Sequence, residues 1–351
     1  RGLRAQRKAA KHELKHALGV SPRVTVDPDT HEMVNENDTA RCSLRVFDGE
    51  IEEEHEQKSR LFNGYFYPKP PEGKYDKGYE GLNQYFVQRS FSDDGLIATF
   101  KLYKENPEKV DFHISAITTA EQTTFEFSMS ETDFTPYGDS YLGKMSSSFS
   151  GRFFHLYDYG LSSNRMWPPD LLPALRRRER ALVVYAVNIL GREPNQFEVL
   201  IPDSGGQEVV SDTQQDKEFA DDEDELFAEY DSSQQRGNGG GEPGPPRTQK
   251  QSKLAKIFTS DDYTGYRYLV TKQAAWDNRI QAWTLDFKGR VRVPSKKNFL
   301  VIDPNEPDEH PYMVFGKLSR DRFSLDCRPP ISPLQGLFIA LTSFATKLLV
   351  T

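Results

Sequence analysis

Short stretches in which apolar and polar residues alternate recur from Tyr85 onward and are separated by turn residues. Such alternation is typical of half-buried strands, because successive side chains on a strand point to opposite faces. In chain order the stretches are QYFVQRSF, IATFKLY, VDFHISAI, TTFEFSMS, SYLGKM, RFFHLYDY, ALVVYAVNIL, FEVLIP, YRYLVTKQ, AWTLDFKGRVRV, NFLVID and YMVFGKLS. Many short strands at close spacing predict an antiparallel sandwich or barrel.

The segment SPLQGLFIALTSFATKLLV near the C-terminus departs from this pattern, because it is apolar on every side and uncharged between Arg328 and Lys347. Its dense apolar part, 334–345, is shorter than the roughly 20 residues that a membrane span needs. A helix without a polar face must be enclosed by other elements, and nearly everything else here is strand. We therefore expect an α+β fold in which a closed, mainly antiparallel β-barrel surrounds a central, buried, C-terminal hydrophobic helix.

Two segments before the strands have a different composition. Residues 1–18 carry six Lys or Arg and one Glu, with a thin apolar stripe, and so predict a basic amphipathic helix over 1–20. This helix is either a solvated one or a docking peptide for a partner protein or an anionic membrane. Residues 21–82 are rich in Pro, Asp, Glu, Gly and Tyr and are interpreted as mostly flexible linker.

An acidic segment interrupts the strands. Residues 203–231 contain twelve acids and one base, so their local charge of −11 leaves +3 for the rest of a chain whose total is −8. A Gly/Pro/Gln-rich run follows. The whole range 203–256 cannot bury enough apolar surface to order itself, and we predict a disordered insert. A mildly basic body with a separate acidic segment is able to meet a negative surface.

Residue patterns for catalysis and metal binding are missing from the sequence. It has no HExxH, GxSxG, Walker loop or Cys-x-x-Cys pattern, and the acids at 221–225 lack EF-hand spacing. We expect a non-enzymatic protein without cofactor or metal. Its two distant cysteines favour reduced thiols in a cytosolic or nuclear setting. The acidic segment disfavours direct binding of nucleic acid.

A lysine lies within the strand-like stretch GDSYLGKMSSSF. Strand alternation predicts that Lys144 shares one face with Leu142, Ser146 and Ser148, while Tyr141 and Met145 take the other. A cation beside small hydroxyl groups suits an anion. The alternative is an ordinary solvent-facing lysine.

Several motifs occur together and in order, namely GDSYLGKM with FHLYD, YAVNILG, WTLDFKGRV with SKKNF, VFGKLSRDRFSLD and finally PLQGLFIALTSFATKL. Through these motifs the chain from about Tyr85 to Thr351 resembles the C-terminal domain of the tubby-like proteins, which we assign to 83–351. The resemblance implies a closed barrel of twelve strands around the terminal helix. This agrees with the architecture expected from the apolar helix.

For function, the resemblance implies binding of phosphatidylinositol 4,5-bisphosphate and tethering to the plasma or ciliary membrane. It also implies an adaptor role in which the N-terminal helix engages a trafficking complex and links membrane cargo to ciliary transport. We expect a monomer that is cytoplasmic and peripheral at these membranes, with a nuclear location as a further expectation.

The resemblance also implies which residues form the lipid-binding pocket. When the family's motifs are matched to this sequence, the pocket lysine corresponds to Lys144, the pocket arginine to Arg177 and a pocket amide to Thr124. Two features depart from the family. Its second cation is replaced by Ser146, and its basic loop is replaced by the uncharged-to-acidic stretch AITTAEQTT at 116–124. These departures favour a second hypothesis, a protein-binding scaffold that kept the barrel and lost or weakened the lipid site.

Overall fold

The computed structural model describes residues 24–26, 33–35, 65–66, 70, 77–106, 109–119, 122–136, 138–160, 177–188, 194–203, 252–307 and 309–347. The chain divides into two compact units, 1–60 with 163–176 and 61–162 with 177–351. In the first unit, β1 (Val24–Val26) and β2 (Met33–Asn35) form a two-stranded antiparallel sheet. All the other described elements belong to the second unit.

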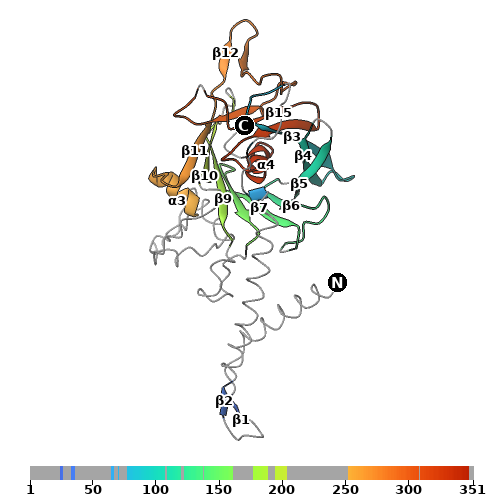
Figure 1. Ribbon diagram of the computed structural model, residues 1–351, viewed down its shortest axis with the longest axis vertical. Helices are drawn as coiled ribbons and strands as arrows, with labels where there is room; N and C mark the ends of the chain where they lie inside the picture. Colours follow the sequence, from blue (N-terminus) through green and yellow to red (C-terminus); the bar gives the residue numbers. More distant parts are fainter. Residues whose placement is uncertain are drawn as a thin grey trace, which may run out of the picture. The chain divides into compact units, whose positions relative to one another are not determined.

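Twelve antiparallel strands of the second unit close into a barrel (Figure 1). Each strand pairs with the next barrel strand along the chain, and the last pairs with the first. The strands are β3 (Asn83–Phe91), β4 (Ile97–Glu105), β5 (Val110–Thr119), β6 (Thr124–Ser128), β7 (Tyr141–Ser147), β8 (Phe153–Asp158), β9 (Glu179–Tyr185), β10 (Phe197–Pro202), β11 (Tyr266–Thr271), β14 (Phe299–Ile302), β15 (Met313–Lys317) and β16 (Arg322–Cys327).

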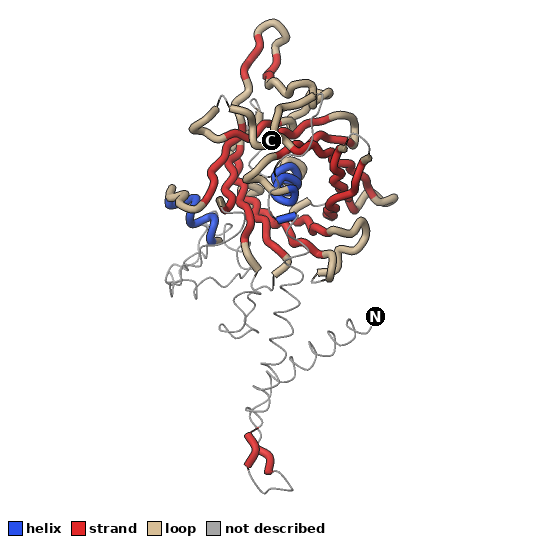
Figure 2. The backbone as a smooth tube through the Cα atoms, in the orientation of Figure 1, coloured by secondary structure: helices blue, strands red, loops and turns tan. Residues whose placement is uncertain are grey.

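Helix α4 (Pro333–Thr342) lies inside this ring, and Figure 2 shows it as the blue helix surrounded by red strands. All ten of its residues are buried. Leu334, Leu337, Phe338, Ile339 and Leu341 together contribute roughly 7–15 kcal/mol of hydrophobic stabilisation, at about 1.5–3 kcal/mol for each side chain. That range is comparable with the whole stability of a typical domain. The predicted barrel around a central C-terminal helix is confirmed.

A capping box fixes where α4 begins. The Ser332 hydroxyl accepts a hydrogen bond from the Gln335 backbone, and the Gln335 side chain accepts one from the Ser332 backbone N–H. Pro333 follows the cap, where a missing N–H has no cost. The Gln335 amide also donates to the Arg180 carbonyl at 2.8 Å, which ties the start of the helix to β9. The cap therefore sets both the start of the helix and its depth in the barrel.

Two segments cover the outer wall. Helix α3 (Lys253–Ser260) places Leu254 against Leu182 and Leu200 of β9 and β10. On another part of the wall, the side chains of Leu285 and Phe287 pack over Leu300, Val314 and Leu82. This second covering follows a short hairpin, β12 (Ala275–Asp277) and β13 (Ala282–Thr284), which projects from the barrel (Figure 1).

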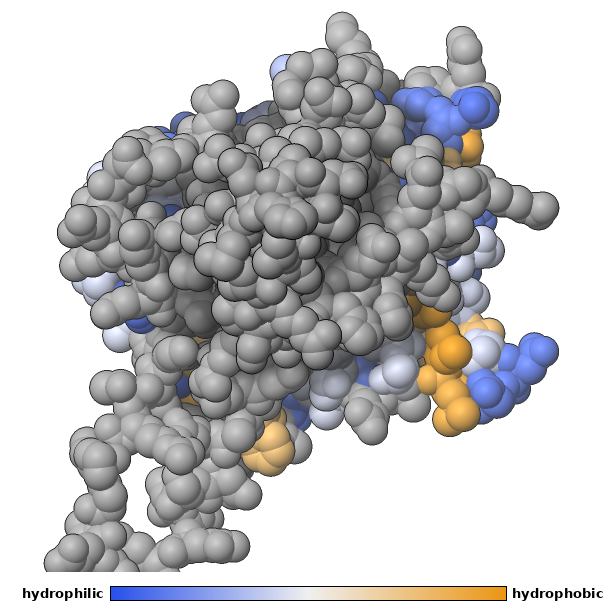
Figure 3. Space-filling view, turned by 90° about the horizontal axis from the view of Figure 1, so that it is seen from below, coloured by the Kyte–Doolittle hydropathy of each residue, from blue (hydrophilic) through white to orange (hydrophobic). Residues whose placement is uncertain are grey.

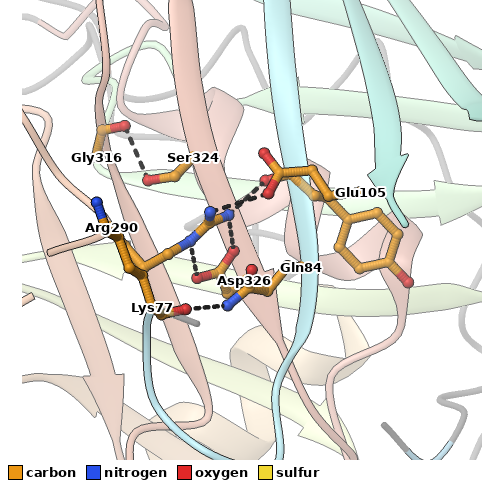
Figure 4. A network of polar contacts seen from close by, with 8 residues as sticks. Lys77, Gln84, Glu105, Arg290, Gly316, Ser324 and Asp326 are labelled. Atoms are coloured by element: carbon orange, nitrogen blue, oxygen red, sulfur yellow. Dashed lines mark hydrogen bonds and ion pairs between the residues drawn. The ribbon is translucent and has the colours of Figure 1, made fainter. Parts of the chain in front are cut away.

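A buried ion-pair network anchors the covering segment to the wall (Figure 4). The Arg290 guanidinium donates to both carboxylate oxygens of Asp326, at 2.7 and 2.6 Å, and to Glu105 at 2.9 Å. Gln84 of β3 donates from Nε2 to the Lys77 carbonyl at 2.5 Å. The network joins β3, β4 and β16 to residues outside the barrel, so the segment after β13 is held by charge as well as by apolar contact.

The exposed large apolar side chains of the described residues lie at strand ends, in the connections between strands and on the β12–β13 hairpin. Phe91, Leu96 and Ile97 surround the β3–β4 turn. Trp276 and Trp283 face each other across the β12–β13 hairpin, with their ring centres 5.4 Å apart. Figure 3 shows hydrophobic side chains gathered at one edge of the described surface, beside strongly hydrophilic ones. No helix in the described ranges has both the length and the apolar character needed to cross a membrane.

The structure differs from the sequence-based expectations in several details. Residues 253–256, the end of the predicted insert, form the first half of α3, and 116–119 of the expected loop belong to β5. Two residues of the predicted linker, Tyr65 and Phe66, pack against the main core. The predicted helix at 1–20 and most of the insert lie outside the described residues.

The prediction that the Leu142 side chain lies on the same strand face as Lys144 is also wrong. A bulge interrupts the β6–β7 pairing at Gly143, so that Phe127 pairs with Gly143 and Ser128 with Tyr141. The additional residue in β7 breaks the simple two-residue alternation. Leu142 is fully buried in the main core instead of sharing the outer face with Lys144.

Candidate functional site

Lys144 and Ser146 lie on the outer face of β7. Their neighbour Met145 is fully buried in the core, and alternation places the residues on either side of it on the opposite face. Across β6, Ser146 pairs with Thr124 and Lys144 pairs with Glu126. Three of the four predicted site residues therefore lie together on one patch of the outer wall.

The three side chains differ in exposure. Thr124 is exposed, Lys144 is half-buried and Ser146 is buried, with 8% of its surface accessible. The Ser146 hydroxyl has no hydrogen-bond partner among the described residues. A hydroxyl both donates and accepts, and leaving one unsatisfied in a buried position has a free-energy cost. The patch thus contains a polar group whose hydrogen-bonding capacity is unused.

Arg177 comes just before β9, on the other side of β8. Lys144 pairs with Tyr157 of β8, and Tyr157 pairs with Glu179, two residues beyond Arg177. The arginine is only 9% exposed, and its Nε donates to the Gly160 carbonyl at 3.2 Å. The fold therefore brings Arg177 to the same part of the wall, with β8 between it and Lys144, and part of its guanidinium is already used within the protein.

Carboxylates flank the patch. Glu126 is the cross-strand neighbour of Lys144, and it accepts a hydrogen bond from the Tyr141 hydroxyl. Glu179 is more enclosed. Its oxygens accept from the Ser252 hydroxyl at 3.0 Å and the Leu254 backbone N–H at 2.9 Å. Because Glu179 accepts a hydrogen bond from the Leu254 backbone N–H in the first turn of α3, a built-in carboxylate already takes the place where an external anion would bind a helix N-terminus.

Sequence reasoning missed the group of residues at the start of α3. His155 Nδ1 lies 2.6 Å from Glu179 Oε1 and 3.3 Å from the Ser252 hydroxyl. His155 is also the β8 neighbour of Ser146. One signal for the helix was present, since Ser252 precedes apolar residues 254, 257 and 258 at helical spacing. No sequence signal joins this helix to His155, because the contact spans about a hundred residues of chain.

A metal site and a reactive thiol place specific requirements on the described part of the chain. Within the described ranges, no group of three or more His, Cys, Asp or Glu side chains is placed to hold a metal ion. Cys327 is buried, and burial raises the pKa of its thiol far above the ordinary value. The arrangement offers hydrogen bonds and positive charge to a ligand on the outer wall.

Comparison with known proteins places the chain in a family. A family model described as the Tub family matches residues 77–346. Tubby-related protein 2 of Mus musculus is 29% identical over 261 residues, which cover 73% of this chain and 40% of that protein. Tubby protein homolog 1 of Caenorhabditis briggsae is 30% identical over 240 residues, which cover 68% of this chain and 49% of that protein.

Tubby protein homolog 1 of Caenorhabditis elegans is 28% identical over 268 residues, which cover 74% of this chain and 55% of that protein. The chain thus spans about half the length of the curated relatives it matches. The matched region contains the whole barrel and α4. On this match and this fold, the chain belongs to the Tub family.

Proposed function

We propose that this protein is a non-enzymatic adaptor that binds phosphatidylinositol 4,5-bisphosphate and sits peripherally at the plasma or ciliary membrane. The observation that carries the proposal is the cluster of Lys144, Ser146 and Thr124 on one patch of the outer wall, with Arg177 on the far side of the neighbouring strand β8. Membership of the Tub family supports it.

The chemistry of these side chains fits a vicinal bisphosphate. The Lys144 ammonium is a compact positive charge that can bridge two phosphate groups, and the Arg177 guanidinium, which donates from Nε to the Gly160 carbonyl, adds positive charge nearby. Thr124 and Ser146 add hydroxyl groups on the same face. The Ser146 hydroxyl lacks a partner among the described residues but is enclosed, so the Lys144 ammonium and the exposed Thr124 hydroxyl are the groups that the headgroup can reach.

The expected affinity is modest. Glu126 lies beside Lys144, and residues 116–124 contain no Lys or Arg. Each basic residue near an anionic membrane contributes about 1 kcal/mol, so replacing several lowers the affinity by one to a few powers of ten. Exposed charges are screened beyond about 8 Å at physiological ionic strength, so binding should also weaken with added salt.

Liposome flotation tests the proposal. We expect the full chain to float with vesicles that contain the bisphosphorylated lipid and to float less with vesicles that lack it. Lys144→Ala should weaken flotation about 5-fold, the effect of about 1 kcal/mol. Thr124→Lys adds a cation at an exposed position opposite Ser146 and should strengthen flotation by a similar factor.

Lys288→Ala is the matched control, because Lys288 is exposed and directly follows Phe287, which packs over β14 and β15 and away from the Lys144 patch. It should leave flotation unchanged. Arg177→Ala is less suitable as a test, since it removes a nearly buried side chain and its contact with Gly160. Two outcomes would contradict the proposed site. One is flotation that is the same with and without the bisphosphorylated lipid, and the other is an equal change of flotation in Lys144→Ala and Lys288→Ala.

A protein-binding scaffold is the second candidate function. The observation that favours it is the pair of carboxylates at the patch, Glu126 beside Lys144 and Glu179 at the start of α3. Indifference to the lipid in the same flotation experiment is the result this candidate predicts. The proposed trafficking partner of residues 1–20 is testable by comparing partner capture by the full chain and by a chain without these residues.

A further inference from the structure

A cavity of about 220 Å³ lies at the end of the barrel where α4 finishes. Its walls come from the end of β9, the starts of β10 and β14, and the residues that follow α4. Three lysines line it, Lys296, Lys297 and Lys347, together with the rings of Tyr185, Phe197, Phe299 and Phe344. It is separate from the Lys144 patch on the outer wall.

Two of the lysines bind the end of the helix. Lys297 Nζ donates to the Ser343 carbonyl at 2.6 Å, and Lys347 Nζ donates to the Thr342 and Ala345 carbonyls at 2.5 and 3.1 Å. Both ammonium groups also lie 4.6 Å from an aromatic ring centre. Positive charge at a helix C-terminus is favourable, so these contacts explain why lysines enter the barrel here.

The positive charge exceeds what the helix end requires. A helix C-terminus carries about half a negative charge, whereas three lysines bring up to three positive charges. None of the residues lining the cavity is Asp or Glu. Arg89 and Lys317 add further repulsion at Lys297, and Arg89 is itself paired with Asp321. The cavity is therefore a positive site without a compensating carboxylate in its lining.

The pKa values of Lys297 and Lys347 are lowered, as expected for buried lysines that lie near other positive charges and have no carboxylate in the cavity lining. Burial, together with smaller contributions from the charges of Arg89 and Lys317, lowers the pKa of Lys297 to about 8. Burial lowers the pKa of Lys347 to about 7, with an additional contribution from Lys297. A bound anion would favour the charged forms of both groups.

Unused donors and the size of the cavity limit the kind of ligand. An ammonium has three N–H groups. Lys297 uses one and Lys347 uses two on acceptors within the described part of the chain. A volume of 220 Å³ equals roughly seven water molecules at about 30 Å³ each, below the roughly 300 Å³ at which pockets for drug-sized molecules begin. The site suits a small, highly charged group.

We propose that this cavity binds a phosphate group through the ammonium groups of Lys296, Lys297 and Lys347. Compact ammonium charges match a phosphate dianion, which brings more charge than a single carboxylate. The group belongs either to a soluble phosphate compound or to a phospholipid headgroup that reaches the barrel end. The site does not depend on lipid binding at Lys144.

Isothermal titration of the full chain with inorganic phosphate tests this, against chloride at equal ionic strength and pH 7. We expect a dissociation constant of about 1 mM or tighter for phosphate and no measurable binding of chloride. Lys296→Gln removes an exposed lysine at the rim and should weaken binding about 5-fold, while Lys288→Gln should change nothing. Equal heats for phosphate and chloride would overturn the proposal.

A second measurement needs no variant. Lysines of the wild-type chain are acetylated at pH 7.5 with and without phosphate, and the modified positions are read by mass spectrometry. Phosphate should protect Lys296, Lys297 and Lys347 while leaving Lys288 unprotected. Identical labelling of the three cavity lysines in both conditions would overturn the proposal, whatever the stability of any variant.

Vesicles of phosphatidic acid distinguish the two sources. Flotation that Lys144→Ala leaves unchanged and Lys296→Gln weakens by a similar 5-fold factor assigns the phosphate to a lipid headgroup. Binding of inorganic phosphate without such flotation assigns it to a soluble compound. Both results support the cavity as a phosphate site, and failure of both probes rejects it while leaving the Lys144 proposal intact.

Discussion

Asp326 is a carboxylate with no exposed side-chain surface, and its charge is balanced by the Arg290 guanidinium (Figure 4). Burial raises the pKa of Asp326 to about 6, although the hydrogen bonds from Arg290 oppose this rise. The pair is nearly enclosed, since the Arg290 side chain is only 10% exposed. Removing one partner therefore leaves an uncompensated charge inside the wall.

We predict that Arg290→Met lowers the free energy of unfolding by about 3–5 kcal/mol at pH 7.5. The loss should be smaller at pH 5. Without Arg290 the folded-state pKa of Asp326 rises further above its unfolded value, so the folded state binds an extra proton and stability falls as pH rises through that window. Urea unfolding at both pH values measures this, and an equal loss at pH 5 and pH 7.5 would contradict it.

The sequence located some site residues and not others, for identifiable reasons. Lys144 and Ser146 were placed on one face because local alternation decides it, and the structure keeps them together. The burial of Arg177 and its bond to Gly160 depend on the connection between β8 and β9. Glu179 at the start of α3 is a contact between distant segments, which local pattern does not encode.

At the scale of elements, the bulge in β7 sets the position of the site. Gly143 has a φ of +148°, and a Cβ there would lie 2.0 Å from the Tyr157 carbonyl oxygen. Only glycine allows the two backbones to approach so closely. Lys144 follows this residue directly, so the bulge determines where the lysine meets β8.

We predict that Gly143→Ala destabilises the fold by more than about 3 kcal/mol and weakens flotation with the bisphosphorylated lipid, because β7 must move away from β8. Gly95→Ala is the matched control. Gly95 also has a positive φ, +72°, yet a Cβ there meets nothing within 4 Å, so the expected cost is about 1 kcal/mol. Thermal unfolding of both variants checks this, and equal losses of stability would refute the close-approach argument.

A helix or strand could be predicted where its apolar pattern is long and not adjoined by a segment of very different composition. The apolar helix required an enclosing sheet, and the barrel around α4 is confirmed. Helix α3 was overlooked because its short apolar pattern adjoins a Gly/Pro/Gln-rich run whose composition dominated the interpretation. The segment that contains Leu285 and Phe287 was interpreted as a strand. Its alternating apolar residues fit a strand that pairs in the sheet, but they equally fit a segment that packs its side chains over the outside of the barrel, as observed.

For the whole molecule, the charge distribution is the property that bears on the proposed membrane binding. The acidic segment gives the chain a net charge of −8, and residues 204–231 account for −10 of it. Deleting these residues changes the net charge to +2. The remaining 232–251 still connect β10 to α3.

We predict that this deletion strengthens binding to anionic vesicles on the order of ten-fold at low ionic strength, because long-range repulsion is removed. The gain should shrink in 150 mM salt, where charges beyond about 8 Å are screened. Flotation across a salt series measures the effect. A chain in which the deleted acids are replaced by the same number of Ser and Gly residues controls for loop length, and a gain that is independent of salt would show that charge is not the cause.

Helix α4 follows all twelve barrel strands along the chain, yet it fills the space that they enclose. During synthesis every strand leaves the ribosome before the residues that complete the interior. A ring that closed early would trap an empty lumen and shut the helix out. We therefore infer that the strands stay an open sheet until α4 has been made, and that the apolar face of this sheet is a surface that chaperones would cover.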